Sequence, residues 1–94
     1  NRVFQALEDV SADVRAEAVT LIGKSCDAED VETLLLKKLS DEDTQVRKNT
    51  ALSLMKLDAL GSIQNLKIAE QKEDDPDVKA VIRVAINILS AKTG

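Results

Sequence analysis

Few side chains in this sequence could do covalent or acid–base chemistry. The chain has no histidine and a single cysteine, Cys26. Without histidine, most metal sites and the usual pairs of a nucleophile with a base are excluded. Cys26 is followed by Asp27, whose negative charge disfavours the reactive thiolate. We therefore predict that Cys26 is a structural or surface cysteine and that the chain has no catalytic residue.

Acidic residues gather in three short clusters that could suggest calcium. The clusters read DAED at 27–30, SDED at 40–43 and KEDDPD at 72–77. None of them has the spacing or the glycine of a calcium-binding loop. Acids are also favoured where helices begin, because they cap the helix and match its dipole. We predict helix capping, with no metal and no cofactor, and keep as an alternative an acidic edge that attracts a basic partner.

Composition excludes several further classes of function. The 94 residues have a net charge of −4 and a single aromatic residue, Phe4, so that neither a basic surface nor a base-stacking platform is expected. No apolar run is long enough to span a bilayer, and no signal peptide begins the chain. These features predict a chain that binds neither nucleic acid nor membranes. They favour an intracellular, cytoplasmic location.

The sequence repeats itself three times without gaps. DVRAEAVTLIGKS begins at residue 13, QVRKNTALSLMKL at 45 and DVKAVIRVAINIL at 77, which gives a period of 32 residues. The segments between them share the period too, since Phe4, Leu36 and Ile68 occupy one column. A period of this length indicates a solenoid, in which stacked units bury a core that one unit could not bury alone.

Each unit is predicted to form two helices, with an apolar spacing of three to four residues in both. The first helices are expected at about 28–39 and 62–72, after a short stub at 2–8. The second helices are expected at about 12–25, 44–57 and 76–90. Ser11, Asp43 and Asp75 occupy one column and are good caps for the second helices. Gly61 is expected to end the turn within LGS at 60–62.

The repeated pattern, close to D-x-x-V-R-x-x-A and followed by apolar pairs, resembles HEAT repeats. Its short period is most similar to the subgroup named after phycobilisome lyases. The resemblance covers nearly the whole chain and implies an all-α fold, a right-handed α-solenoid of about three stacked helix pairs. It implies one domain at 1–94, with an incomplete first pair at 1–25, a second at 28–57 and a third at 62–90, which could be a piece of a longer solenoid.

The same resemblance implies a ladder of hydrogen bonds between adjacent repeats. HEAT repeats place an acid in the turn within a repeat and a base early in the second helix. The matching positions stand six residues apart, and they are Asp9 with Arg15, Asp41 with Arg47, and Glu73 with Lys79. We expect the third rung to be weaker, because lysine lacks the planar fork of arginine.

The second helices are also expected to line the concave side of the solenoid, where such proteins often bind partners. The candidate protein-binding surface consists of Glu17, Thr20, Lys24, Lys48, Asn49, Leu52, Lys56, Val81, Val84 and Ile88. Its first members are polar, whereas the third repeat carries three apolar residues. Either a further repeat covers these apolar residues, or they form a docking patch for another protein or a second copy of the chain.

These observations favour a non-catalytic scaffold that binds another protein or a second copy of itself. The alternative implied by the resemblance is a component of a lyase that attaches bilins to light-harvesting proteins, or of a related HEAT-repeat enzyme. No cluster of residues in the sequence is suited to grip a tetrapyrrole. Recognition of DNA, as in HEAT-like glycosylases, disagrees with the negative charge and the absence of tryptophan and tyrosine.

Overall fold

The structure is a computed structural model that describes residues 2–93, so the ends of the predicted range 1–94 lie outside the described residues. The described part contains helices and no strand. The elements are α1 (Arg2–Ala6), α2 (Ala12–Ser25), α3 (Ala28–Lys38), α4 (Thr44–Lys56), the 3-10 turn η1 (Leu60–Ser62), α5 (Ile63–Lys72) and α6 (Pro76–Thr93). The sequence therefore predicted each helix to within about three residues.

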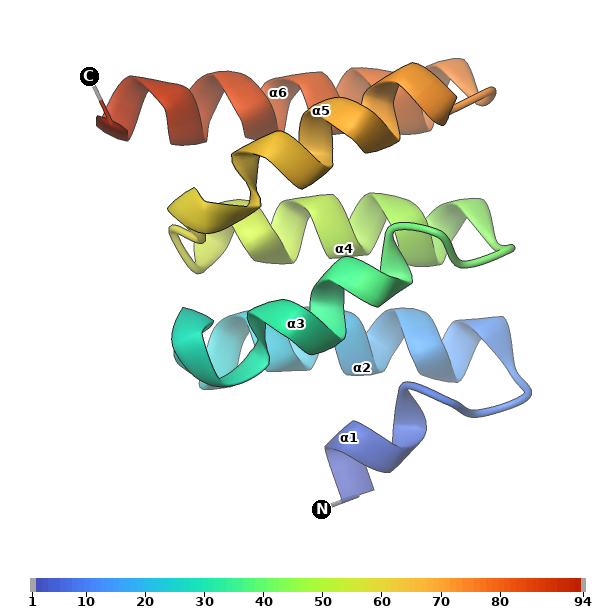
Figure 1. The fold of residues 1–94 in the computed structure, drawn as a ribbon. Coiled ribbons are helices and arrows are strands. Elements are labelled where there is room, and N and C mark those ends of the chain that lie inside the picture. The colour runs from blue at the N-terminus through green and yellow to red at the C-terminus, as the bar shows by residue number, and fades with distance from the viewer. Residues whose placement is uncertain (1, 94) are drawn as a thin grey trace.

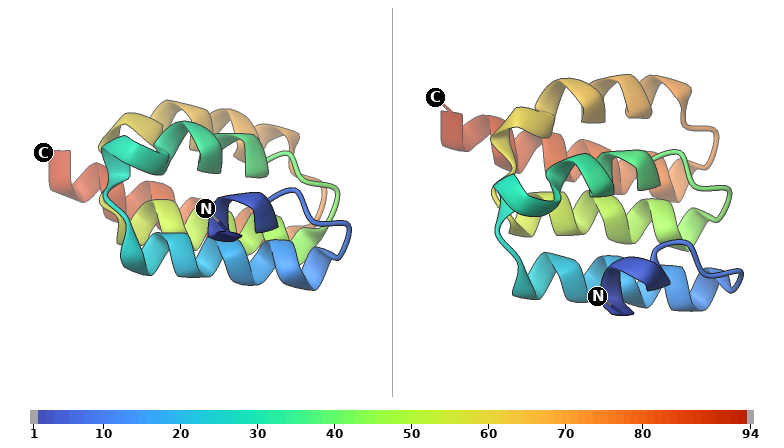
Figure 2. Two further views of the ribbon diagram at one scale, coloured as in Figure 1. Left: turned by 90° about the horizontal axis from the view of Figure 1, so that it is seen from below. Right: turned by 60° about the horizontal axis from the view of Figure 1, so that its bottom comes forward.

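The helices form two layers (Figure 1). α2, α4 and α6 lie side by side in one layer, with α4 in the middle and in contact with both neighbours. α1, α3 and α5 form the other layer, and each packs mainly on the second helix of its own repeat (Figure 2). The predicted all-α solenoid of helix pairs is confirmed.

The repeated columns of the sequence build the core. Val46 and Val78 share a column and are fully buried between neighbouring helices of the α2–α4–α6 layer. Helix α6 buries one whole face, as its apolar spacing predicts. This face consists of Val78, Ile82, Ala85, Ile86 and Leu89. Stability thus comes mainly from contacts between adjacent repeats, as in other solenoids.

The three predicted caps begin the second helices. Ser11 Oγ accepts a hydrogen bond from the backbone N–H of Val14. The carboxylates of Asp43 and Asp75 each accept two backbone N–H groups of the first turn, at 2.9–3.2 Å. Such caps satisfy N–H groups that have no partner within the helix.

The turn after α4 differs from the prediction at Gly61. No glycine has a positive φ, and Gly61 lies inside η1. The residue that reverses the chain is Asp58, with φ 54°, in the left-handed region that aspartate tolerates better than most residues. The side chain of Asp58 also pairs with Lys92 in the last turn of α6. This turn is therefore closed by a residue that the glycine pattern did not indicate.

None of the helices within residues 2–93 has both the length and the apolar character that a membrane crossing requires.

Candidate interaction surface

The predicted surface lies on the α2–α4–α6 layer, but the structure divides it into an outward face and a seam. Glu17, Lys24 and Lys56 are exposed, and Thr20 and Leu52 are half-buried. Val84 and Ile88 are 49% and 39% exposed. These seven residues are called the outward face below.

Asn49 and Val81 were expected to point outward, and this expectation is wrong. Asn49 Nδ2 donates a hydrogen bond of 3.1 Å to the carbonyl oxygen of Ala16, so its side chain spans the seam between α2 and α4. Val81 occupies the same column and is partly buried against the core. Both side chains are turned toward the preceding helix, because that helix offers a backbone acceptor or apolar atoms. Lys48 is half-buried as well.

The apolar residues of α6 can be compared with their column-mates in α4, which has a helix on each side. Leu52 stands in the column of Val84 and remains half-buried, while Lys56 stands in the column of Ile88 and remains exposed. A neighbour on both sides therefore does not cover this face of a helix. Of the two explanations for the apolar residues, coverage by a further repeat does not account for Ile88.

A shallow hollow of about 830 Å³ lies on the outward side of α2 and reaches α4. Val14, Leu21 and Lys24 line it from α2, and Asn49 lines it from α4. The hollow combines apolar carbon with one lysine ammonium. It is the part of the described surface where several candidate residues come together.

The ladder is formed between repeats, and its pairing differs from the spacing of six residues. Arg15 Nε and Nη2 donate to the two carboxylate oxygens of Asp41 at 3.0 and 3.1 Å. Arg15 Nη1 donates to the backbone carbonyl oxygens of Asp9 and Val10. Arginine therefore meets the acid six residues earlier only through its backbone, and the carboxylate of the next repeat completes the rung.

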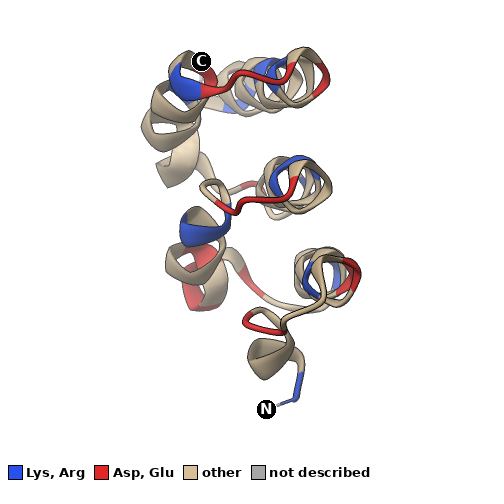
Figure 3. Ribbon diagram, turned by 90° about the vertical axis from the view of Figure 1, so that its right-hand side faces the viewer, with Lys and Arg blue, Asp and Glu red and all other residues tan. Residues whose placement is uncertain are grey.

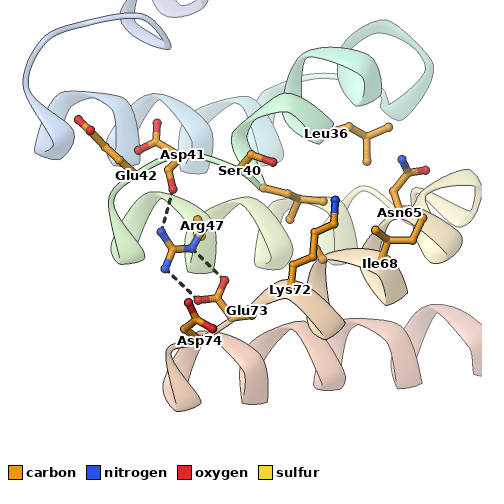
Figure 4. A pocket seen from close by; sticks show the side chains of 12 residues that line it. Leu36, Ser40, Asp41, Glu42, Arg47, Asn65, Ile68, Lys72, Glu73 and Asp74 are labelled. Carbon is orange, nitrogen blue, oxygen red and sulfur yellow. Dashed lines mark hydrogen bonds and ion pairs between the residues drawn. The ribbon is translucent and has the colours of Figure 1, made fainter.

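The second rung repeats this geometry (Figure 4). Arg47 Nε and Nη2 donate to both oxygens of Glu73 at 2.9 Å, and Nη1 donates to the backbone carbonyl oxygen of Asp41. The Glu73 side chain is only 5% exposed. A bidentate pair of this kind fixes the orientation of adjacent repeats.

The electrostatics of the rungs follow from these contacts. Burial raises the pKa of the Asp41 carboxyl, but hydrogen bonds from Arg15 and from the backbone N–H of Asp43 outweigh it, so the pKa lies below its ordinary value. Hydrogen bonds from Arg47 lower the pKa of Glu73 more than burial raises it. Both acids are therefore charged in the folded protein at neutral pH.

The third predicted pair, Glu73 with Lys79, does not form. Glu73 is engaged by Arg47 of the preceding repeat, and Lys79 makes no ion pair within residues 2–93. The pairing rule explains this, because each base reaches an acid 26 residues later in the sequence. The spacing of six residues joined the wrong partners.

Two further charged groups were missed by the sequence analysis. Lys38 is buried, and its ammonium lies 3.0 Å from Glu8 and 4.0 Å from Asp41. Arg83 Nε lies 2.5 Å from Glu70 on the far side of α6. Their columns hold unlike residues in the other repeats, so the repeat pattern gave no signal for them.

The remaining candidate groups lie apart from one another. Cys26 is half-buried against the core at the end of α2, and its backbone N–H bonds to Ile22. Acidic residues occupy the turns that lead into the second helices (Figure 3). Within the described residues, no three acidic or cysteine side chains are placed to hold a metal ion.

Sequence comparison connects this geometry to known proteins. The family model for HEAT repeats matches residues 1–87. The chain belongs to the HEAT-repeat family. The chain is also similar to the bilin biosynthesis protein MpeU of Synechococcus sp. (strain WH8020), with 47% identity over 87 residues. The match covers 93% of this chain and 29% of MpeU. This HEAT-repeat chain thus spans less than a third of that relative's length.

Proposed function

We propose that this HEAT-repeat chain is a protein-binding module of a protein that handles bilins, and that it is not itself an enzyme. The identity of 47% to a protein named for bilin biosynthesis supports the pathway. The fold supports the mode of action, because a solenoid offers long surfaces on which a polypeptide can lie. Its partner would be the protein that carries the bilin.

The observation that carries this proposal is the exposed apolar pair on α6. Val84 and Ile88 are 49% and 39% exposed, and they stand in columns that stay accessible in α4 despite its two neighbours. Exposed apolar side chains beside polar ones are typical of binding sites for proteins. Leu52 extends the pair along the face, and Lys24 and Lys56 flank it with positive charge.

The test measures binding to a light-harvesting subunit that lacks its bilin. Val84→Asp places a charge in the patch, and we expect it to weaken binding roughly tenfold or more, as substitutions in the centre of an interface do. The matched control is Leu21→Asp, because Leu21 is equally exposed but lies on another side of its helix. Equal effects of the two variants, or no binding by the unmodified chain, would contradict the proposal.

The same two variants distinguish a second copy of the chain as the partner. Light scattering over a concentration series gives the mass in solution. A dimer that Val84→Asp converts to a monomer, while Leu21→Asp leaves it intact, would assign the face to self-association. A monomer at all concentrations leaves the face free for a different protein.

The hollow on α2 supports a second candidate, in which the chain takes part directly in a bilin lyase. A bilin is an extended apolar chain of four pyrrole rings with carboxylate groups, and the hollow offers apolar Val14 and Leu21 beside the ammonium of Lys24. A volume of about 830 Å³ falls in the range of small-molecule sites. Asp13 and Glu17 also line the hollow and oppose a carboxylate ligand.

Titration with free biliverdin, followed by absorbance, separates the two candidates. Binding in the hollow predicts a saturable spectral change that Lys24→Ala weakens severalfold. Lys56→Ala is the matched control, because Lys56 occupies the same column on α4 and does not line the hollow. A spectral change that is absent, or that both variants weaken equally, would dismiss the second candidate.

A further inference from the structure

The layer of α1, α3 and α5 has two gaps between its helices, and side chains close them to different degrees. In the gap between α1 and α3, the ammonium of Lys38 bridges Glu8 and Asp41. The hollow that remains there has a volume of about 290 Å³ and is lined only by charged residues. This first gap is filled by its own ion pairs.

The gap between α3 and α5 lacks that bridge, because two columns have changed. Ser40 stands where the first gap has Glu8, and Glu70 stands where it has Lys38. Glu70 cannot bridge carboxylates, and it pairs instead with Arg83 of α6. A groove of about 430 Å³ remains open between the helices (Figure 4).

The floor of this groove is apolar. Ile68 is 44% exposed, and Leu36 and Ala69 are half-buried beside it. Figure 4 shows Leu36 and Ile68 along one end of the groove and the charged residues at the other. A concave site with an apolar floor is suited to take an aliphatic side chain from outside.

The rim of the groove is acidic. Four carboxylates and two cations line it, which leaves two negative charges in excess. Asp41 and Glu73 are already engaged by Arg15 and Arg47 in the ladder. Glu42 has a side chain that is 90% exposed, and its only partner within residues 2–93 is Arg15 at 3.9 Å.

Asp74 stands beside Glu73 on the same rim. It is exposed and makes no ion pair within the part of the chain that the structure describes. Lys72 lies across the groove from these carboxylates (Figure 4) and is the single lining cation outside the ladder. The two outer carboxylates therefore offer acceptors to a cation that enters from solvent.

We propose that the groove between α3 and α5 binds a segment of another protein in which an arginine or lysine stands next to an aliphatic residue. The aliphatic side chain lies on Ile68 and Leu36, and the cation meets Glu42 and Asp74. This surface belongs to the opposite layer from the outward face. The chain can thus hold two polypeptides at once, and this second site does not depend on the bilin pathway.

The test titrates the folded chain with a short capped peptide that alternates leucine and arginine. Backbone NMR shifts locate the binding, and their concentration dependence gives the dissociation constant at low salt. We expect saturable shifts at Leu36, Ile68 and Ala69. The same peptide with glutamate in place of arginine should bind at least tenfold more weakly, because it meets the acidic rim with like charge.

Variants of the chain separate the groove from general charge attraction. Glu42→Gln together with Asp74→Asn should weaken binding roughly fivefold, since each exposed carboxylate contributes modestly. The matched control is Glu29→Gln with Asp30→Asn, which removes the same charge from the first turn of α3, at the opposite edge of the molecule. Ile68→Ser should weaken binding roughly tenfold through the lost apolar contact.

Four outcomes would overturn the proposal. The first is equal weakening by the two charge variants, which would mean attraction to net charge alone. The second is a set of shifts on the outward face of α2, α4 and α6. The third is absence of binding at millimolar peptide. The fourth is a shift of the groove residues with protein concentration and no peptide, which would assign the groove to a second copy of the chain.

Discussion

α2 and α6 lie at the two ends of one layer and share the same register, yet opposite sides of them are buried. The side of α2 that faces α4 carries Ala16, Val19 and Gly23, all of which are buried. The corresponding side of α6 carries Ala80, Arg83 and Asn87, all of which are exposed. The seam requires small or apolar residues, and the free side of α6 has polar ones.

The other sides of the same helices show the reverse. Val14 and Leu21 of α2 are exposed, while their column-mates Val78 and Ala85 of α6 are fully buried against α4. One end of the layer therefore presents apolar residues and the other presents charge. The comparison shows that a column of the repeat does not determine burial, because the neighbouring helix does.

The largest expected difference between seam and free side concerns two arginines. Arg47→Ala leaves the buried carboxylate of Glu73 without its two hydrogen bonds, and we expect the free energy of unfolding to fall by about 2–3 kcal/mol. Arg83 is 66% exposed, so Arg83→Ala should cost no more than about 0.5 kcal/mol despite its ion pair with Glu70. Urea unfolding followed by circular dichroism measures both.

A second substitution tests the cause of the larger effect. Glu73→Gln in the Arg47→Ala background removes the unpaired buried charge, and it should recover part of the lost stability. Failure to recover any stability would mean that the packing of the arginine chain, rather than the charge pair, stabilises this seam.

The next difference should have opposite signs at the two ends. A Cβ on Gly23 would lie 2.4 Å from Ser53 Oγ and 3.0 Å from the Ser53 Cα, so Gly23→Ala forces α2 and α4 apart. We expect a net loss of about 1–2 kcal/mol after the gain in helix propensity. Asn87 stands in the same column of α6 and is exposed, so Asn87→Ala should stabilise by a few tenths of a kcal/mol.

The close approach of α2 and α4 also supplies the control for Gly23→Ala. Ser53→Gly removes the atoms that the new methyl group meets, and the double variant should lose less than the sum of the two single variants. Thermal unfolding of the four proteins gives this coupling. Additive losses would mean that the helices have room for the methyl group.

Local chemistry explains why the helices could be predicted from the sequence. The caps Ser11, Asp43 and Asp75 act within one turn of their own residues, and the apolar spacing of α6 is read along a single helix. The turn at Asp58 is the exception, because the left-handed residue there is not a glycine. Features that depend on neighbours in the chain were therefore mostly visible.

Contacts between repeats were less visible, since the same sequence spacing permits several partners. Nothing in the spacing of Asp41 and Arg47 tells that each of them pairs across a different seam. Asn49 was expected to face outward because it is polar, but a carbonyl oxygen of α2 satisfies it in the seam. The candidate docking residues Val84 and Ile88 were identified, because an apolar residue in a polar column is a signal within the sequence itself.

The smallest predicted difference appears on acidification. The pKa of Glu73 in the folded protein is lowered by Arg47, so in acid the unfolded chain binds more protons than the folded one. This contribution to stability is fully present above the ordinary carboxyl pKa, and it is lost as the pH falls below roughly 4.5 toward the lower folded pKa.

In Arg47→Ala the sign reverses at this residue. The buried carboxyl keeps the cost of its burial and loses its hydrogen bonds, so acid relieves the variant by protonating Glu73. The gap in stability between the unmodified chain and Arg47→Ala should therefore narrow as the pH falls from 6 to 3. Arg83→Ala serves as the control, because its ion pair lies on the exposed side of α6, and its gap should stay constant over the same range. A gap for Arg47→Ala that is independent of pH would mean that the rung contributes packing but no charge pair, and the seam and the free side of α6 would then differ in shape alone.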